Sequence, residues 1–202
     1  MKRLIVLETT GSTRKVIYSL SVSLDGFIED RDGGLGWVTA DEEMHAFVSQ
    51  QEAEIDTHLY GRRMYETMSA FWPTADQDPN NPPYVHEYAR IWRGMKKVVF
   101  SRTLAQVGAG ARLVRGDIAE EVARLKAQPG KHMGIAGAGL AASFAQLGLI
   151  DEYQMYVEPV ILGGGKPFFA PLDQPERLRL VEARPLQSGI VFLRYQTAAA
   201  AP

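Results

Sequence analysis

The sequence predicts an α/β protein with a mixed central sheet that is mostly parallel and antiparallel at one edge. Strand and helix patterns alternate from about residue 16 to residue 150, as is typical of parallel sheets flanked by helices. After residue 150 only strand patterns follow, joined by Gly- and Pro-rich turns. No internal repeat and no long linker divides the 202 residues, so a single α/β domain is expected.

The strands of the first part of the chain are predicted from apolar runs or apolar–polar alternation. They cover residues 16–23, 58–60, 97–101 and 111–114. The helix after the first strand is expected to begin with the capping box Thr39-Ala-Asp-Glu42, in which the two side chains satisfy each other's backbone donors. Met44, Phe47 and Val48 then recur at helical spacing and form its apolar face.

The remaining elements follow from start and stop signals. Further helices are expected at residues 62–71, 84–95, 118–128 and 140–149, and further strands at residues 132–136, 153–162, 178–183 and 190–196. Residues 73–83 are rich in Pro, Asn and Asp and are expected to form a surface loop. Residues 1–15 are expected to be an N-terminal extension and residues 198–202 a frayed tail, which leaves residues 16–197 as the domain.

Composition excludes several classes of function. The chain has no cysteine, so disulfides, thiolate nucleophiles, zinc–thiolate sites and iron–sulfur clusters are ruled out. Its 22 basic and 24 acidic residues give a net charge of −2, without the basic excess of proteins that bind nucleic acid or anionic membranes. No signal peptide and no apolar stretch of about 18 residues is visible, so a cytoplasmic protein is expected.

The turn Gly137-Ala-Gly-Leu-Ala-Ala142 lies between a predicted strand and a predicted helix. Glycines there let the backbone approach a phosphate, and the helix N-terminus supplies free N–H donors. The alternative is close packing of small residues between helix and sheet. A dinucleotide-binding fingerprint would normally open its domain, whereas this turn lies past the middle of the chain. Gly163-Gly-Gly-Lys166 lacks the spacing of a P-loop.

Two basic turns also follow predicted strands, Gly61-Arg62-Arg63 and Ser101-Arg102-Thr103. Guanidinium groups and hydroxyls are suited to phosphate, although a single arginine on a turn is usually just solvated. Because the carboxyl ends of parallel strands share one edge, the three turns together favour an extended anionic ligand.

Other constellations are weaker. The four histidines show no metal-binding spacing, so no metal site is expected, and no G-x-S-x-G motif indicates a serine hydrolase. Aromatic residues surround the Pro-rich loop, either as local packing or as a lid over a flat substrate. They are Phe71, Trp72, Tyr84 and Trp92.

Taken together, the motifs resemble the dihydrofolate reductase-like family. They are VIYSLSVSLDGFIED, Trp37, HLYGRRMYETM, KKVVFSRTL, GIAGAGLAASFAQLGLIDEY and VEPVILGGGKPFF, in order over residues 15–197. The chain looks closer to the C-terminal reductase domain of riboflavin-biosynthesis deaminase–reductases (RibD). The resemblance implies a three-layer fold with a central, mostly parallel sheet of about eight strands, flanked by helices and ending in antiparallel strands.

The resemblance also implies an NADPH site. Residues corresponding to the family's cofactor contacts are Gly61, Arg62, Arg63, Ser101, Arg102, Ala136, Gly137, Ala138, Gly139 and Leu140. Arg102 corresponds to the residue with which the family binds the adenosine 2′-phosphate, which favours NADPH over NADH. Met64 stands where the family often has a threonine, a departure that backbone contacts to phosphate tolerate.

The substrate side carries less information. Asp41, Glu42 and Glu43 lie near the place of the family's helix acid, and of these Glu43 is the chosen catalytic candidate. Asp25 is the other candidate, unless it is simply a turn-forming aspartate before glycine. Trp37, Phe71 and Trp72 are expected to wall the substrate pocket.

The sequence therefore favours an NADPH-dependent reductase of a small planar pyrimidine- or pterin-like heterocycle, with homodimerisation as a further expectation from the relatives. The absence of a unique substrate acid keeps an alternative open, a non-catalytic, dimeric nucleotide-binding protein on the same scaffold. True dihydrofolate reductase activity is a third reading.

Overall fold

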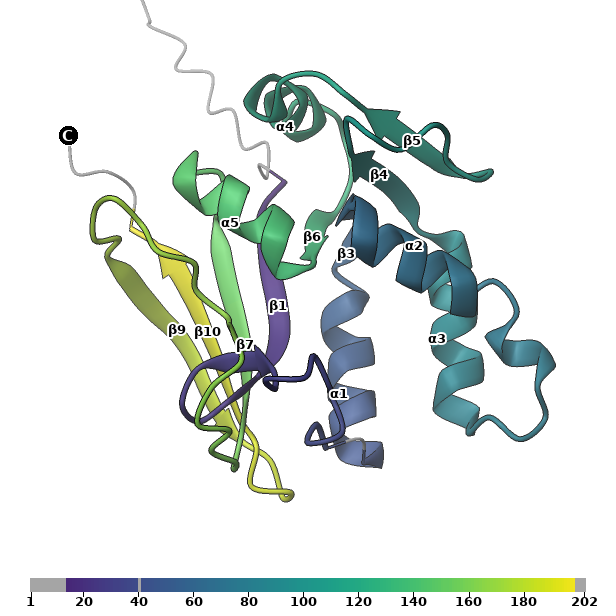
Figure 1. Ribbon diagram of the computed structural model, residues 1–202. Coiled ribbons are helices and arrows are strands. Elements are labelled where there is room, and N and C mark those ends of the chain that lie inside the picture. Colours follow the sequence, from purple (N-terminus) through teal and green to yellow (C-terminus); the bar gives the residue numbers. More distant parts are fainter. Residues whose placement is uncertain (1–13, 40, 199–202) are drawn as a thin grey trace, which may run out of the picture.

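A computed structural model of the protein describes residues 14–39 and 41–198. Its central sheet consists of β1 (Val16–Ser23), β3 (Ile55–Gly61), β4 (Lys96–Phe100), β5 (Ala111–Val114), β6 (His132–Ala136), β7 (Glu152–Glu158), β9 (Leu178–Pro185) and β10 (Val191–Thr197). The strand order is β5-β4-β3-β6-β1-β7-β10-β9 (Figure 1). The pairings from β5 to β7 are parallel, and β10 runs antiparallel to both its neighbours. The predicted mixed α/β class is confirmed.

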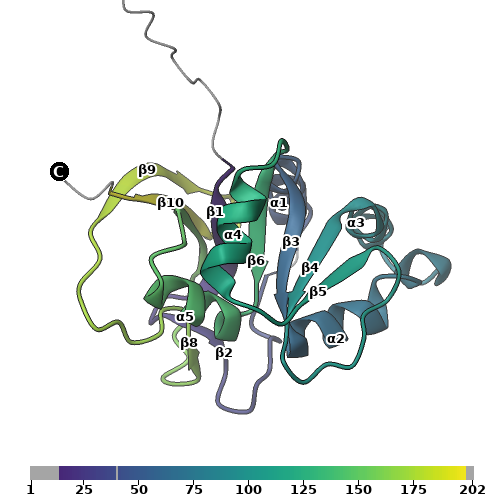
Figure 2. The ribbon, with the colours of Figure 1, turned by 90° about the horizontal axis from the view of Figure 1, so that it is seen from above.

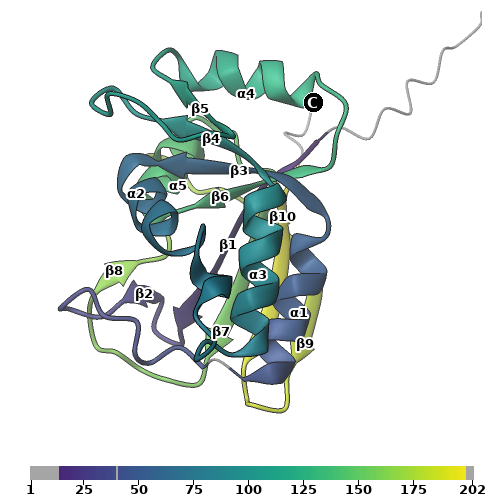
Figure 3. The ribbon, with the colours of Figure 1, turned by 90° about the vertical axis from the view of Figure 1, so that its right-hand side faces the viewer.

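Helices cover both faces of the sheet (Figure 2). They are α1 (Glu42–Glu52), α2 (Arg62–Phe71), α3 (Pro83–Gly94), α4 (Ile118–Lys126) and α5 (Ala138–Gln146). Val122 of α4 and Phe144 of α5 belong to the core on one face. On the other face, Phe47 of α1 packs on Tyr156 and Phe192, and α3 lies beside α1 (Figure 3). Within the described residues, no helix has the length and apolar character needed to cross a membrane.

The boundaries of several elements differ from those predicted. Helix α1 is capped by Asp41, whose carboxylate accepts a hydrogen bond of 2.7 Å from the Met44 N–H, so the expected cap at Thr39 is wrong. Aspartate is at least as good a cap as threonine, and Asp41 stands directly before the helix. Strand β7 ends at Glu158 because Pro159 has no N–H for the ladder. The expected extension and tail lie outside the described residues, except for residues 14, 15 and 198.

Two short strands and one helical turn were not predicted. β2 (Phe27–Glu29) and β8 (Lys166–Pro167) form a separate antiparallel pair, and η1 (Ala75–Gln77) lies within the Pro-rich loop. Strands of two or three residues are too short to show a periodic pattern. The β2–β8 pair lies beyond the carboxyl end of β1, where it contributes to the site described below.

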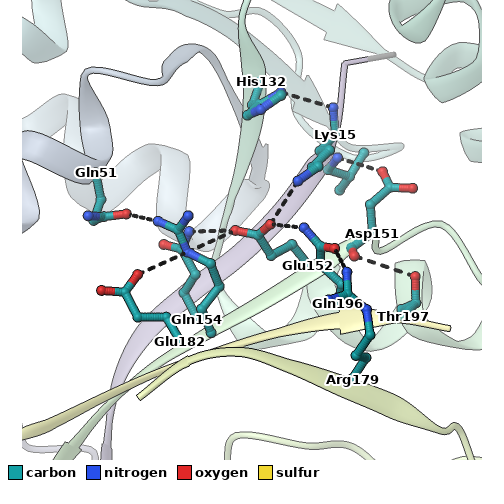
Figure 4. A network of polar contacts seen from close by, with 12 residues as sticks. Lys15, Gln51, His132, Asp151, Glu152, Gln154, Arg179, Glu182, Gln196 and Thr197 are labelled. Carbon is teal, nitrogen blue, oxygen red and sulfur yellow. Dashed lines mark hydrogen bonds and ion pairs between the residues drawn. The ribbon is translucent and has the colours of Figure 1, made fainter. Parts of the chain in front are cut away.

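A polar network joins β1, β7 and β10 near the amino end of β7 (Figure 4). At its centre Glu152, which is 2% exposed, accepts hydrogen bonds from Lys15 and Gln196 at 3.1 Å each and from Gln154 at 2.8 Å. Arg194 lies 3.5 Å from the same carboxylate. Burial alone would raise the pKa of Glu152, but these hydrogen bonds outweigh it and hold the pKa below its usual value.

The replacement Glu152→Leu is expected to lower the free energy of unfolding by about 3 kcal/mol, because donors that now share a buried carboxylate lose their acceptor. Urea denaturation measures the change. Glu87→Leu, at an exposed position on α3, is the control and should change stability by less than about 0.5 kcal/mol. Equal effects of the two replacements would contradict the role of the network.

Candidate functional site

A cavity of about 780 Å³ opens at the carboxyl ends of β3, β4, β5 and β6. Its lining includes every residue predicted for the cofactor: Gly61, Arg62, Arg63, Ser101, Arg102, Ala136, Gly137, Ala138, Gly139 and Leu140. The cavity has the size of typical small-molecule and cofactor sites. The structure therefore brings the three predicted turns together around one space.

Helices α2 and α5 begin side by side in this cavity. Gly137, the residue before α5, has a φ of 103°, and a Cβ there would lie 3.2 Å from the Cβ of Met64. A Cβ on Gly61, before α2, would meet that of Leu140 at 3.6 Å. A side chain at Gly137 would strain the backbone and press on α2. Glycine at this position is what allows the two helix starts to approach so closely.

The N-termini of these two helices have free backbone donors. Neither α2 nor α5 has a side-chain cap, and neither has an acidic residue in its first turn. By contrast, α1 and α4 are capped by Asp41 and Asp117 and each carries two glutamates in its first turn. Uncapped N–H groups and the positive ends of the helix dipoles favour an anion. Two such ends in one cavity favour a ligand with more than one phosphate group.

Three arginines add positive charge to the lining. Arg62, Arg63 and Arg102 are exposed there, and in residues 14–39 and 41–198 no acceptor pairs with their guanidinium groups. Sequence reasoning missed Arg115, which also lines the cavity and donates to the carbonyl oxygens of Leu104 and Ala105 at 2.6 and 2.9 Å. Arg115 thereby holds the loop that carries Arg102. Its signal was present in the sequence, since it directly follows a predicted strand.

The β2–β8 pair contributes Glu29 and Lys166 to the lining of the cavity. Their side chains form an ion pair of 2.9 Å across the two strands. An exposed pair of this kind adds little stability. It does place one carboxylate and one ammonium group in a cavity whose other charged lining residues are all arginines.

A second cavity, of about 190 Å³, lies between α1 and the face of β1 and β7. Its polar lining residues are Ser19, Ser21, Gln51, Glu52, Gln154 and Tyr156, and its apolar ones are Leu20, Met44, Val48 and Ile55. A mixture of this kind suits a small flat molecule with polar edges. Sequence reasoning missed this cavity, because it depends on how α1 packs against strands remote in sequence.

Asp25 ties two loops together. Its carboxylate accepts hydrogen bonds from the Ser23 hydroxyl at 2.7 Å, the Leu162 N–H at 3.1 Å and the Gly163 N–H at 2.7 Å. These bonds, above all the one from Ser23, lower the pKa of the Asp25 carboxyl. The contacts account for a loop-anchoring group, and Asp25 lines neither of the two cavities. Its catalytic role stays a prediction.

Glu43 joins α1 to the turn between β9 and β10 through a hydrogen bond. Its carboxylate accepts a hydrogen bond of 2.8 Å from the Gln187 N–H. Like Asp25, it lines neither cavity. Both predicted acids are thus engaged with backbone donors, and the catalytic role of Glu43 is also still a prediction.

The predicted substrate wall is not assembled around either cavity. Trp37 donates its indole N–H to the Gly34 carbonyl oxygen at 3.2 Å. The ring centroids of Phe71 and Trp72 lie 4.9 Å apart, and those of Trp72 and Tyr88 on α3 lie 4.5 Å apart. The two aromatics at the end of α2 therefore pack locally, in line with the packing alternative, and a substrate role for the three residues remains an expectation.

Comparison with known proteins shows the family to which the chain belongs. Residues 14–192 match the RibD C-terminal domain family. The uncharacterized protein YyaP of Bacillus subtilis (strain 168) is 37% identical over 185 residues, covering 90% of this chain and 94% of YyaP.

Two solved structures share the fold. A Shewanella sp. PV-4 protein, provisionally named for riboflavin biosynthesis, superposes with a TM-score of 0.73 at 23% identity, covering 92% of this chain and 99% of its own. Dihydrofolate reductase from Enterococcus faecalis, in complex with NADP(H), superposes with a TM-score of 0.62 at 14% identity, covering 92% of this chain and 97% of its own.

The replacement Asp25→Asn is expected to lower the thermal midpoint at pH 7, because the amide offers one acceptor and brings an N–H₂ group against backbone donors. The pKa of Asp25 is lowered in the folded protein, so its contribution to stability is present above the unfolded value of about 3.9 and is lost as the pH falls through the folded value. The difference from the wild type should therefore shrink as the pH falls below the unfolded pKa of an aspartate. Asp32→Asn, on the neighbouring exposed loop, is the control. A thermal midpoint equal to that of the control at pH 7 would contradict the anchoring role.

Proposed function

Because the chain belongs to the RibD C-terminal domain family and has the dihydrofolate reductase-like fold, we propose that it is an NADPH-dependent reductase. Its substrate is a small planar heterocycle of the pyrimidine or pterin type. The observation that carries the proposal is the convergence on one cavity of two uncapped helix N-termini and three arginines that have no acceptor in the described part of the chain. A phosphorylated dinucleotide has the charge and the length that such a lining accommodates.

Different residues of the cavity lining suit different groups of this cofactor. The N–H groups at the starts of α2 and α5 would bind the pyrophosphate, and the exposed Arg62 and Arg63 would add charge beside it. Arg102, on the loop held by Arg115, would pair with the 2′-phosphate of the adenosine. No atom lies within 4 Å of the position that a Cβ on Gly139 would occupy, so that side of the backbone is open to a phosphate. When bound, NADPH supplies the hydride from its nicotinamide ring.

We place the substrate in the smaller cavity between α1 and the sheet. Met44, Val48 and Ile55 would cover the faces of a flat ring, while serine and glutamine side chains would meet its polar edges. The residues of this cavity would orient the ring and exclude water from it. Trp37, Phe71 and Trp72 line neither cavity, so Met44 and Val48 of α1 would contact the ring instead.

One observation favours the alternative of binding without turnover. The carboxylates of Asp25 and Glu43 both accept hydrogen bonds from backbone N–H groups, and neither residue lines either cavity, so neither predicted proton donor lies at the proposed sites. A dimeric nucleotide-binding protein on this scaffold would need the large cavity but no such donor.

Wild-type protein tests the two functions directly. The reductase is expected to be stabilised thermally by NADPH more strongly than by NADH and to oxidise NADPH, followed at 340 nm, with a member of a panel of pterins, pyrimidines, flavins and quinones. Binding without oxidation across the panel supports the alternative. No thermal response to either cofactor at millimolar concentration would remove both.

The replacement Arg102→Gln is expected to weaken NADPH binding by about 10- to 100-fold, because it removes one charge-assisted contact to phosphate. Affinity for NADH, which lacks the 2′-phosphate, should stay within about twofold. Isothermal titration calorimetry measures both affinities. Arg90→Gln, on the exposed side of α3, is the matched control and should bind as the wild type does. An equal loss for the two cofactors in Arg102→Gln would contradict the assignment.

A further inference from the structure

Strand β7 carries two buried glutamates with opposite surroundings. Glu152 and Glu158 are six residues apart, so both point to the α1 face of the sheet. Their exposures are 2% and 0%. Four polar side chains surround the carboxylate of Glu152 (Figure 4). Among the described residues, neither oxygen of Glu158 has a hydrogen-bond partner.

A carboxyl group buried in this way destabilises the fold. Leaving a buried polar group without a partner costs about 1 to 3 kcal/mol, and more if the group is charged. Native proteins keep few such groups, and catalytic or ligand-binding roles are among the reasons for keeping them. The contrast with Glu152, on the same strand and face, shows that this chain can surround a buried glutamate with partners. Glu158 therefore calls for a partner from outside the protein.

The position of Glu158 is that of a ligand-binding residue. It ends β7, in register with Ser23 at the end of β1, and in open α/β sheets ligands bind at the carboxyl ends of the strands. The large cavity lies at the same edge, beyond the ends of β3, β4, β5 and β6. Glu152 lies at the opposite, amino end of β7.

Glu158 itself is not among the residues that line the smaller cavity. That lining does include Ser21 and Tyr156, which lie two positions before Ser23 and Glu158 on the same face of their strands. Two residues of a strand span about 7 Å, roughly the width of a six-membered ring with a substituent. Because Glu158 is closed off from solvent, a ring would reach it from this cavity rather than from the surface.

We infer that Glu158 recognises the substrate through paired hydrogen bonds between its carboxyl group and one edge of a planar nitrogen heterocycle. The matching edge carries an amino group next to a ring nitrogen. One oxygen accepts from the amino group, and the other shares a proton with the ring nitrogen, so both unpaired oxygens gain a partner. The statement that this ring is the molecule reduced rests on the proposed function. The binding of the ring by Glu158 is independent of that function.

Thermal stability without ligand gives the first test. Glu158→Leu is expected to raise the thermal midpoint, because it removes an unpaired polar group from an apolar site. Glu152→Leu, the matched control on the same strand, is expected to lower it. Destabilisation or failure to fold in Glu158→Leu would assign Glu158 a structural role and overturn the inference.

Binding of 2-aminopyrimidine, followed by NMR titration, gives the second test, with pyrimidine, which lacks the amino group, as the comparison. Wild-type protein is expected to bind 2-aminopyrimidine more tightly than pyrimidine, and Glu158→Leu to lose about tenfold or more of that affinity. Glu158→Gln, whose amide can form the same pair of bonds, is expected to retain most of it. NADPH affinity should be the same in all three proteins.

Equal binding of 2-aminopyrimidine by the wild type and Glu158→Leu would overturn the inference and leave a trapped water as the partner. A different result would contradict the proposed function, namely that the wild type does not bind or oxidise NADPH. A loss of 2-aminopyrimidine binding in Glu158→Leu supports the inference whether or not NADPH is oxidised.

Discussion

The side-by-side start of α2 and α5 is the constraint on which the rest of the site depends. Strands β3 and β6 are parallel neighbours with Tyr60 opposite Ala136, so the turns after them leave the sheet at the same level. Glycine at position 137 then lets α5 begin against Met64 of α2. Two helix dipoles and their free N–H groups are thereby directed to one place, which a neutral ligand would not need. The arginines of the neighbouring turns extend the same positive surface.

The two ends of the parallel strands serve different purposes. Near the amino end of β7, Glu152 is saturated with hydrogen bonds and holds β1, β7 and β10 together. At the carboxyl end, three kinds of polar group find no side-chain partner within residues 14–39 and 41–198: the helix starts, the Arg102 guanidinium and the carboxyl group of Glu158. Unpaired polar groups cost stability, which the satisfied end of the sheet offsets. Stability and ligand binding are thus separated along one strand.

The sequence predicted the fold class and the meeting of the three turns at one cavity, because these signals are local. Each of the three turns directly follows a strand, and parallel strands bring such turns together without further information. The substrate side was harder, because it depends on contacts between distant segments. Asp25 and Glu43 look like free acids in the sequence, yet their backbone partners lie 137 and 144 residues away. The cavity under α1 and the isolation of Glu158 likewise arise only from packing.

A crystal structure of the protein with NADPH would show directly where the phosphates bind. We expect the pyrophosphate to lie between the first turns of α2 and α5, and the 2′-phosphate to lie within hydrogen-bond distance of the Arg102 guanidinium group. A cofactor bound elsewhere on the protein, or a pyrophosphate that contacts neither helix start, would contradict this expectation.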